Sequence, residues 1–393
     1  MEISENIRYV GVDDGALDLF EGQYRLDFGV TYNSYVILDE KIAVLDTVDR
    51  RATGEWLLNI KKVLNGRKPD YLIVQHLEPD HSGGISELCE RFPDMQLVMS
   101  KKASDMLPQF IDEDYSDRVI VAKENDEISL GEHTLQFILA PMVHWPEVMM
   151  TFEKKEKVFF SADAFGSFGT TRNGVSWLVE ARRYYFNIVG KYGASVQTLL
   201  KKVNALGVSI IAPLHGHVLK EDLVEFLEYY DKWSKYKPER KGVLLCYASA
   251  HGNTKEAALY LSDLLQNKGE KVVIIDLNRD DMARAVEGAF CFDRTIICSI
   301  TYDGELFPCV EDFLYHLKIK KFQNRKIAIV ENGSWAPVAA KKIKDALSEM
   351  EGIEVIDPVL TIKTRRTKND DSKFIELRDA IIKAGHEMDM NTM

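Results

Sequence analysis

The chain has 393 residues, which is long for one domain and suits two, each able to bury its own apolar core. Its apolar fraction of 46% and charged fraction of 28% are ordinary for a soluble globular protein. Basic residues number 50 and acidic residues 62, and the net charge of −12 argues against a nucleic-acid partner or an anionic membrane surface.

The cysteines and the amino terminus indicate the compartment. Five cysteines stand at irregular spacing without a Cys-x-x-Cys pair, which is typical of reduced thiols in a cytosol. The first residues lack the basic and apolar regions of a signal peptide, and no uninterrupted apolar stretch is long enough to span a bilayer. We therefore expect a soluble, cytoplasmic protein that binds neither membrane nor nucleic acid.

The first part of the chain predicts short strands followed by strand–helix alternation. Strands are expected between residues 7 and 46, and the alternation over 32–38 favours an antiparallel sheet. Apolar spacing over 51–64 predicts a helix that packs on this sheet. Alternation of strands and helices continues to Lys220, and a polar, aromatic helix is expected over 220–236.

A dense group of possible metal ligands follows the apolar run 71–74, which has the pattern of a buried strand. His76, Glu78, Asp80 and His81 fall within six residues, before Ser-Gly-Gly and a helix expected near residue 85. Extended backbone would place the first three on one face, because side chains alternate along a strand. Imidazole and carboxylate together suit a pair of iron or zinc ions.

Three further ligand-type residues stand at the carboxyl ends of apolar runs. These are His144 in Ala-Pro-Met-Val-His-Trp-Pro, Asp163 in Val-Phe-Phe-Ser-Ala-Asp, and His215 at the end of 208–214. Single residues of this kind are usually structural, and loops are rich in such polar residues by chance. Seven of them at four strand ends favour a metal centre.

The second part of the chain has the pattern of a parallel sheet. A charged stretch with a proline, residues 235–241, is the candidate linker, and it predicts domains over 1–238 and 239–393. Strands expected at 242–247, 271–277, 295–300 and 326–330 alternate with helices, of which the last covers 371–384. This alternation predicts a doubly wound parallel sheet with helices on both faces.

The loop 247–254 enters a helix with hydroxyls, a glycine and free backbone N–H groups, which together make an anion site. It is neither Gly-x-Gly-x-x-Gly nor Gly-Lys-Thr, so dinucleotides and nucleoside triphosphates are disfavoured. It resembles the phosphate loop of flavodoxins, which bind flavin mononucleotide (FMN), although an ordinary capped helix is the alternative. Two later loops add aromatic residues that suit a flat ring. The predicted flavin-binding residues are Ser249, His251, Gly252, Asn253, Thr254, Ser299, Thr301, Tyr302, Asp303, Gly304, Asn332, Gly333, Ser334 and Trp335.

With the His-x-Glu-x-Asp-His motif at residues 76–81, the chain resembles flavodiiron proteins over essentially its whole length. The resemblance implies a metallo-β-lactamase-like αββα domain followed by a flavodoxin-like domain. Glu78 is the most specific feature, because zinc hydrolases of this fold usually have histidine there and a carboxylate suits iron better. The loop 248–251 departs from commoner flavodoxin-like sequences. No rubredoxin-like Cys-x-x-Cys pair follows, so the short form of the family is expected.

The resemblance also implies a ligand set. The first iron would take His76, Glu78 and His144, the second Asp80, His81 and His215, and Asp163 would bridge them. Members of the family differ over His81, and His217 is a rival to His215. Trp145, Tyr184 and Tyr185 are candidate pocket residues, although helix packing is the favoured role for the two tyrosines.

The implied activity is reduction of dioxygen to water, of nitric oxide to nitrous oxide, or of both. Electrons would pass through FMN from a separate small protein such as rubredoxin. The family also implies a homodimer or a dimer of dimers. Two alternatives remain: a zinc hydrolase with an accessory flavodoxin domain, and an electron-transfer module with a vestigial metal site.

Overall fold

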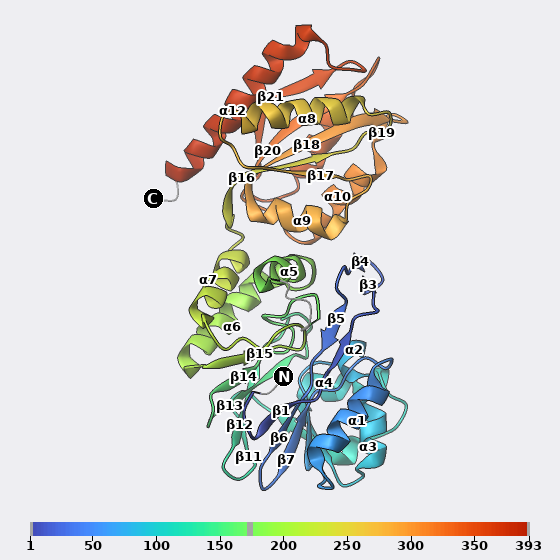
Figure 1. Ribbon diagram of the computed structural model, residues 1–393, viewed down its shortest axis with the longest axis vertical. Helices are drawn as coiled ribbons and strands as arrows, with labels where there is room; N and C mark the ends of the chain where they lie inside the picture. Colours follow the sequence, from blue (N-terminus) through green and yellow to red (C-terminus); the bar gives the residue numbers. More distant parts are fainter. Residues whose placement is uncertain (1–2, 171–175, 391–393) are drawn as a thin grey trace. The chain divides into compact units, whose positions relative to one another are not determined.

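The computed structural model describes residues 3–170 and 176–390, and the chain divides into two compact units, Met1–Asp231 and Lys232–Met393 (Figure 1). This division falls inside helix α7 (Leu223–Ser234). The domain boundary after residue 238 stays a prediction. In the structure the connecting segment is shorter than the predicted linker 235–241, because Arg240 and Lys241 already belong to strand β16 (Arg240–Tyr247).

The first unit contains a six-stranded sheet in the order β1-β6-β7-β8-β9-β10. Its first three strands pair antiparallel, as predicted, and the strands from β7 onward pair parallel. The strands are β1 (Ile7–Tyr9), β6 (Tyr35–Leu38), β7 (Ile42–Leu45), β8 (Tyr71–Val74), β9 (Gln96–Ser100) and β10 (Val119–Ala122).

A second, five-stranded sheet has the order β11-β12-β13-β14-β15 and is antiparallel except for the parallel pair β14–β15. Its strands are β11 (Glu127–Ser129), β12 (Thr134–Leu139), β13 (Met149–Glu153), β14 (Val158–Phe160) and β15 (Ile210–Ala212). Two small ribbons pair β2 (Val12–Asp14) with β5 (Val30–Tyr32) and β3 (Leu19–Phe20) with β4 (Tyr24–Arg25).

The two sheets pack face to face around one apolar core. Alternate residues of the first sheet, such as Tyr35 and Ile37, meet alternate residues of the second, such as Phe137 and Phe160. Each is essentially excluded from water, which stabilises the fold by about 1.5–3 kcal/mol per large side chain. Helices cover the outer faces (Figure 1), so the unit is the expected αββα sandwich. These helices are α1 (Thr53–Leu64), α2 (Pro79–Ser82), α3 (Ile85–Arg91), α4 (Lys101–Met106), α5 (Trp177–Tyr184), α6 (Gly193–Leu206) and α7, with short turns at Leu107–Gln109, Ser116–Arg118, Tyr185–Val189 and Gly190–Tyr192.

The second unit has a parallel sheet in the order β17-β16-β18-β20-β21, which confirms the predicted doubly wound arrangement. Strand β18 is longer than expected because it continues to Tyr302, where it turns back antiparallel into β19. The strands are β16, β17 (Val272–Asp276), β18 (Phe292–Tyr302), β19 (Glu305–Leu306), β20 (Lys326–Asn332) and β21 (Glu354–Ile362).

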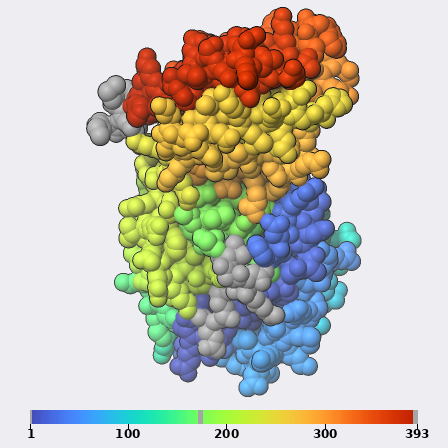
Figure 2. Space-filling view, turned by 45° about the horizontal axis from the view of Figure 1, so that its top comes forward, coloured from blue at the N-terminus to red at the C-terminus, as the bar shows by residue number. Residues whose placement is uncertain are grey.

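Helices cover both faces of this sheet. Leu245 and Ile296 face one side, where Leu261 of α8 and Ile381 of α12 complete the core. The red α12 lies beside the yellow α8 in Figure 2, and the two helices are in contact. Leu244 faces the other side, against Gly288 of α9. The helices are α8 (Asn253–Gln266), α9 (Met282–Cys291), α10 (Pro308–Ile319), α11 (Ala339–Leu347) and α12 (Asp371–Met390), with a 3-10 turn at Lys368–Asp370.

Among the helices of the described residues, none combines the length and apolar character needed to cross a membrane.

Candidate functional site

The ligand-rich motif begins where β8 ends and then turns into a helix. Pro79 occupies the first position of α2, where its fixed φ suits a helix start. The expectation that extended backbone aligns Asp80 with His76 and Glu78 is therefore wrong. Asp80 and His81 lie on a helical turn, and they contribute to a different group of side chains from His76 and Glu78.

The first group brings together four side chains. Nε2 of His144 lies 3.0 Å from Oε2 of Glu78 and 3.0 Å from Oδ2 of Asp163. Nε2 of His76 lies 3.2 Å from Oε2 of Glu78 and 3.4 Å from Oδ2 of Asp163. Two imidazole nitrogens and two carboxylate oxygens thus converge, which are ligand atoms that iron and zinc accept.

The second group consists of Asp80, His81 and His215. The Nε2 atoms of His81 and His215 lie 3.1 Å apart. Oδ1 of Asp80 is 3.5 Å from His81 Nε2, and Oδ2 is 3.3 Å from His215 Nε2. His215, and not its neighbour His217, belongs to this group.

Asp163 lies between the two groups. It follows β14 by three residues and is fully buried, and the left-handed backbone of Ala162 (φ 47°) precedes it. While Oδ2 faces the first group, Oδ1 lies 3.2 Å from Nε2 of His81 and 3.7 Å from Nε2 of His215. One carboxylate therefore presents one oxygen to each group.

Two groups that the sequence did not single out orient the histidines. Nδ1 of His76 lies 2.7 Å from Oε1 of the buried Glu147, which also accepts a hydrogen bond from the backbone N–H of Leu77. Nδ1 of His215 donates to the backbone carbonyl of Thr31 at 2.6 Å. Each contact fixes a tautomer whose Nε2 lone pair faces the pocket. The only sequence signal for Glu147 is its place three residues after His144. A backbone carbonyl such as that of Thr31 gives no sequence signal, because every residue has one.

The charges of the pocket favour cations. Burial opposes the charged form of His144, but hydrogen bonds with Asp163 and Glu78 outweigh it and raise its pKa to about 9. Burial likewise opposes the Glu78 carboxylate, but hydrogen bonds with His144 and His76 hold its pKa below the ordinary value. The pocket therefore stabilises positive charge beside its carboxylates, and metal ions can supply that charge in place of protons.

Unpartnered oxygens show that the residues present fit metal ions. Both carboxylate oxygens of Asp80 are buried and have no hydrogen-bond partner among the described residues, and the same holds for Oδ1 of Asp163. Buried polar atoms normally have a partner, so these oxygens are explained by a group that binds between them. The mixed imidazole and carboxylate set suits two ions of iron or zinc.

Aromatic rings line this pocket. The ring centroid of Trp145 lies 5.2 Å from that of His76, and the centroid of Tyr184 lies 5.5 Å from that of His215. The Tyr184 hydroxyl is buried without a hydrogen-bond partner in the part of the chain that is described. Tyr185 instead packs its ring on Tyr230, with centroids 5.0 Å apart, as expected for helix packing.

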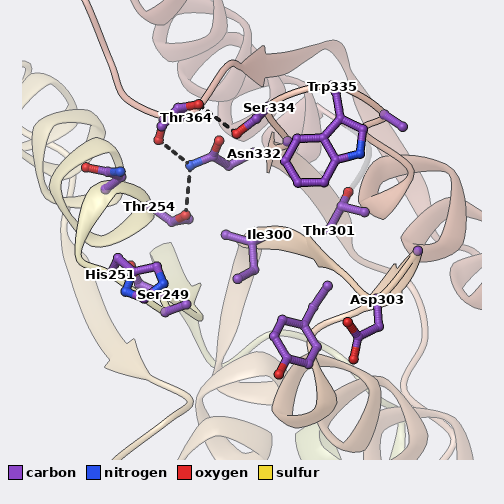
Figure 3. A pocket seen from close by; sticks show the side chains of 16 residues that line it. Ser249, His251, Thr254, Ile300, Thr301, Asp303, Asn332, Ser334, Trp335 and Thr364 are labelled. Carbon is purple, nitrogen blue, oxygen red and sulfur yellow. Dashed lines mark hydrogen bonds between the residues drawn. The ribbon is translucent and has the colours of Figure 1, made fainter.

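In the second unit, a cavity of about 410 Å³ lies where β16, β18 and β20 end (Figure 3). The parallel register aligns Tyr247 with Cys298 and Cys298 with Val330, so the loops that leave these strands meet at one edge. Ligands of open parallel sheets bind at this edge.

One wall of the cavity is the loop that precedes α8. Gly252, with φ +90°, turns the chain into the helix, and its N–H donates to Oγ of Ser249 at 3.0 Å. The first N–H groups of a helix have no partner within it and attract anions. The Asn332 amide donates to Thr254 Oγ1 at 3.2 Å and to the Thr364 carbonyl at 2.9 Å, which ties three loops together (Figure 3).

The opposite wall offers flat rings. Figure 3 shows Trp335 across the cavity from Ser249 and His251, and its side chain is 92% exposed. Tyr302, from the end of β18, is 47% exposed. Exposed aromatic rings at the rim of a cavity are suited to stack on a planar ligand.

Most of the predicted flavin-binding residues line this cavity, with two exceptions. Ser299 is fully buried inside β18, where its hydroxyl donates to the carbonyl of Ile300. Gly252 shapes the loop without lining the cavity. The lining residues that the sequence did not indicate are Ala250, Ile300, Ala336 and Thr364.

Comparisons with known proteins agree with this architecture. Residues 30–216 match the model of the ODP family beta lactamase. An uncharacterized protein of Methanocaldococcus jannaschii is 31% identical over 92% of this chain and 93% of its own length. A nitric oxide reductase of Moorella thermoacetica is 28% identical over 92% of each chain. The rubredoxin oxygen:oxidoreductase of Desulfovibrio gigas superimposes with a TM-score of 0.91 over 98% of each chain, at 25% identity. This agreement confirms the predicted fold of both units.

Proposed function

The chain belongs to the flavodiiron protein family, and on that premise we propose that it is an oxidoreductase that reduces dioxygen, nitric oxide or both. The observation that carries the proposal is the position of Asp163, whose two oxygens face two separate groups of ligand-type side chains. The relatives named for nitric oxide reduction and for oxygen reduction support the two substrates.

In this proposal each group of side chains holds one iron. The first iron would be held by His76, Glu78 and His144, the second by Asp80, His81 and His215, and Asp163 would offer one oxygen to each. Two ferrous ions held there would supply the electrons for reduction of a gas, which zinc ions cannot do. The carboxylate of Glu78, within hydrogen-bond distance of two imidazoles, makes the pocket more anionic and favours iron.

The residues around the ligands hold the geometry. Glu147 and the Thr31 carbonyl fix two imidazole rings through their Nδ1 atoms. Burial keeps the pocket away from bulk water, which strengthens every charge interaction inside it. The Tyr184 hydroxyl, buried beside the ring of His215, keeps its proton because burial and the carboxylate Asp163 hold its pKa far above the ordinary value.

The cavity of the second unit is proposed to bind FMN. The phosphate of FMN would bind to the loop of Ser249 and the start of α8. The flavin ring would lie against Trp335 and Tyr302. FMN accepts electrons from a donor and passes them on singly or in pairs. The family implies a small redox protein, such as rubredoxin, as the donor. A homodimer or a dimer of dimers is likewise the assembly that the family implies.

Separate turnover measurements test the proposal. Reduction of dioxygen to water consumes four electrons and four protons, and reduction of two nitric oxide molecules to nitrous oxide and water consumes two of each. Protein loaded with iron and FMN is reduced without air and then exposed to each gas, while the consumed gas and reoxidised flavin are measured. We expect turnover with at least one gas. Protein that retains two zinc ions in the presence of iron, and consumes neither gas, would instead be assigned to the hydrolase alternative.

A further inference from the structure

The cavity of about 410 Å³ that is proposed to bind FMN is called the flavin cavity. A second hollow, of about 690 Å³, lies on the other side of the loop that precedes α8. It opens at the carboxyl ends of β16 and β17, whereas the flavin cavity spans the ends of β16, β18 and β20. The two share part of their lining, namely Ser249, Ala250, His251 and Tyr302. The residues that belong to the second hollow alone include Tyr247, Lys255, Asp276, Asn278, Arg279 and Phe307.

The hollow holds two cationic side chains and one carboxylate, that of Asp276. Lys255 and Arg279 are exposed and both line it, and no ion pair of either side chain is found within residues 3–170 and 176–390. Exposed cations of one hollow that form no ion pair suit a phosphate or another anion.

A carboxylate lies at the end of β17. Asp276 is the last residue of that strand, and its Oδ2 accepts a hydrogen bond from the Tyr247 hydroxyl at 3.0 Å. Its Oδ1 accepts from the N–H of Asn278 at 3.0 Å. Each carboxylate oxygen can accept a second hydrogen bond, so the group still has room for a hydroxyl of a ligand. In parallel dinucleotide-binding sheets, an acidic residue at the end of the second strand binds a ribose hydroxyl.

Aromatic rings complete the hollow. Phe307 and Tyr302 pack edge to face with ring centroids 5.3 Å apart, and both line it. Such rings offer an apolar surface for a flat base. Two cations, a carboxylate with free acceptor capacity and an aromatic surface are thus present in one hollow.

We propose that this hollow binds a nucleoside phosphate beside the flavin. The phosphate lies on Lys255 and Arg279, the ribose on Asp276, and the base against Phe307. The inference rests on the proposed function only in placing a flavin in the neighbouring cavity. Because the Asn278 side chain accepts a hydrogen bond from the N–H of Ser249 at 2.9 Å, a ligand in the hollow also contacts the support of the flavin loop.

Binding of ADP to the FMN-loaded full chain tests this inference. Equilibrium dialysis measures bound ADP, while flavin absorbance reports whether FMN is retained. We expect ADP to bind with FMN in place, and the double variant Lys255→Gln, Arg279→Gln to weaken binding by about tenfold or more, because both charged contacts with the phosphate are lost. Lys268→Gln is the matched control, because Lys268 is an exposed lysine just past the other end of α8. It should leave ADP binding unchanged.

Three results would overturn the inference: no ADP bound at millimolar concentration, release of FMN in proportion to ADP bound, or equal affinity in the double variant. If the chain retains no FMN at all, the proposed flavin function fails, but ADP binding to the flavin-free chain is still measurable. The two failures are therefore distinguishable.

The same nucleoside phosphate could also reach the hollow as part of FAD. Loading the flavin-free chain with FAD distinguishes this source from a diffusing nucleotide. If ADP binds the FMN-loaded chain and is excluded from the FAD-loaded one, the flavin's own adenylate fills the hollow. If ADP binds both forms equally, the hollow takes a separate nucleotide.

Discussion

Nδ1 of His76 and Oε1 of Glu147 lie 2.7 Å apart, and both side chains are buried. The contact turns Nε2 of His76 toward Glu78 and Asp163. Glu147 thus acts on the metal site through His76 without facing the site itself.

Glu147→Gln should weaken retention of iron, because an amide holds the imidazole less firmly and makes it a poorer ligand. Loss of such a contact typically costs about 10–100-fold in metal affinity. The measurement is iron content after dialysis against a graded series of chelator concentrations, in both proteins.

Glu153→Gln is the matched control. Glu153 is also buried, its Oε1 lies 3.0 Å from Nδ1 of His133, and it also accepts a backbone N–H, that of Lys155. This pair belongs to neither ligand group. Equal loss of iron from both variants would show that Glu147 acts only on folding.

Asp163→Ala should abolish gas reduction while FMN stays bound. The substitution removes one oxygen from each ligand group, whereas the flavin cavity belongs to the other unit. Gas consumption is followed with oxygen and nitric oxide electrodes, and flavin content by absorbance. Consumption at the normal rate would mean that the bridging assignment is wrong.

Trp335→Ala should weaken FMN binding by about two- to tenfold, because stacking of aromatic rings is worth about 0.5–1.5 kcal/mol. Iron content should not change. Fluorescence titration of the flavin-free chain with FMN gives the affinity. Tyr315→Ala is the control, because Tyr315 is an exposed ring on α10 outside the cavity. A Trp335 variant with unchanged FMN affinity and spectrum would place the flavin elsewhere.

The start of α12 should show a pH dependence that comes from Asp370. Its Oδ2 accepts hydrogen bonds from the N–H and the hydroxyl of Thr367, each at 2.9 Å, and these lower the pKa of the carboxyl. The Asp370 carboxyl has a lower pKa in the folded state than in the unfolded state. Its contribution to stability is therefore fully present above the ordinary pKa of about 4, and it is lost as the pH falls through the pKa of the folded state.

Asp370→Asn should therefore speed hydrogen exchange of the peptide over residues 367–373 by about fivefold at pH 7, since a cap is worth about 1 kcal/mol. Near pH 3 the difference between variant and parent should shrink toward zero. Mass spectrometry of the deuterated full chain measures both. A difference that is equally large at both pH values would contradict the role of the carboxylate.

The sequence predicted the elements whose signals are local. The apolar runs and the βα alternation of residues 242–330 gave the parallel sheet, and the strand ends gave the seven ligand-type residues. These signals suffice because a buried strand and the polar residue after it are neighbours in the chain. Pro79 is also a local signal, of a helix start, and it explains why strand alternation does not continue to Asp80.

Long-range convergence could not be predicted in the same way. The backbone carbonyl of Thr364 accepts a hydrogen bond from the Asn332 amide at the flavin cavity. The backbone carbonyl of Thr31 accepts one from Nδ1 of His215. Neither contact depends on residue type strongly enough to leave a pattern in the chain. The burial of Ser299 was not predicted either, because β18 continues past its expected end at residue 300 to Tyr302 and keeps Ser299 inside the sheet.

Asp163 also has a mechanical consequence. Because its two oxygens belong to one rigid planar group, the distance between the two atoms that face the two ligand groups is set by covalent bonds and does not depend on how tightly the two sheets pack. A small shift of the Asp163 side chain therefore moves Oδ1 and Oδ2 together, so neither ligand group can lose its oxygen without a change at the other.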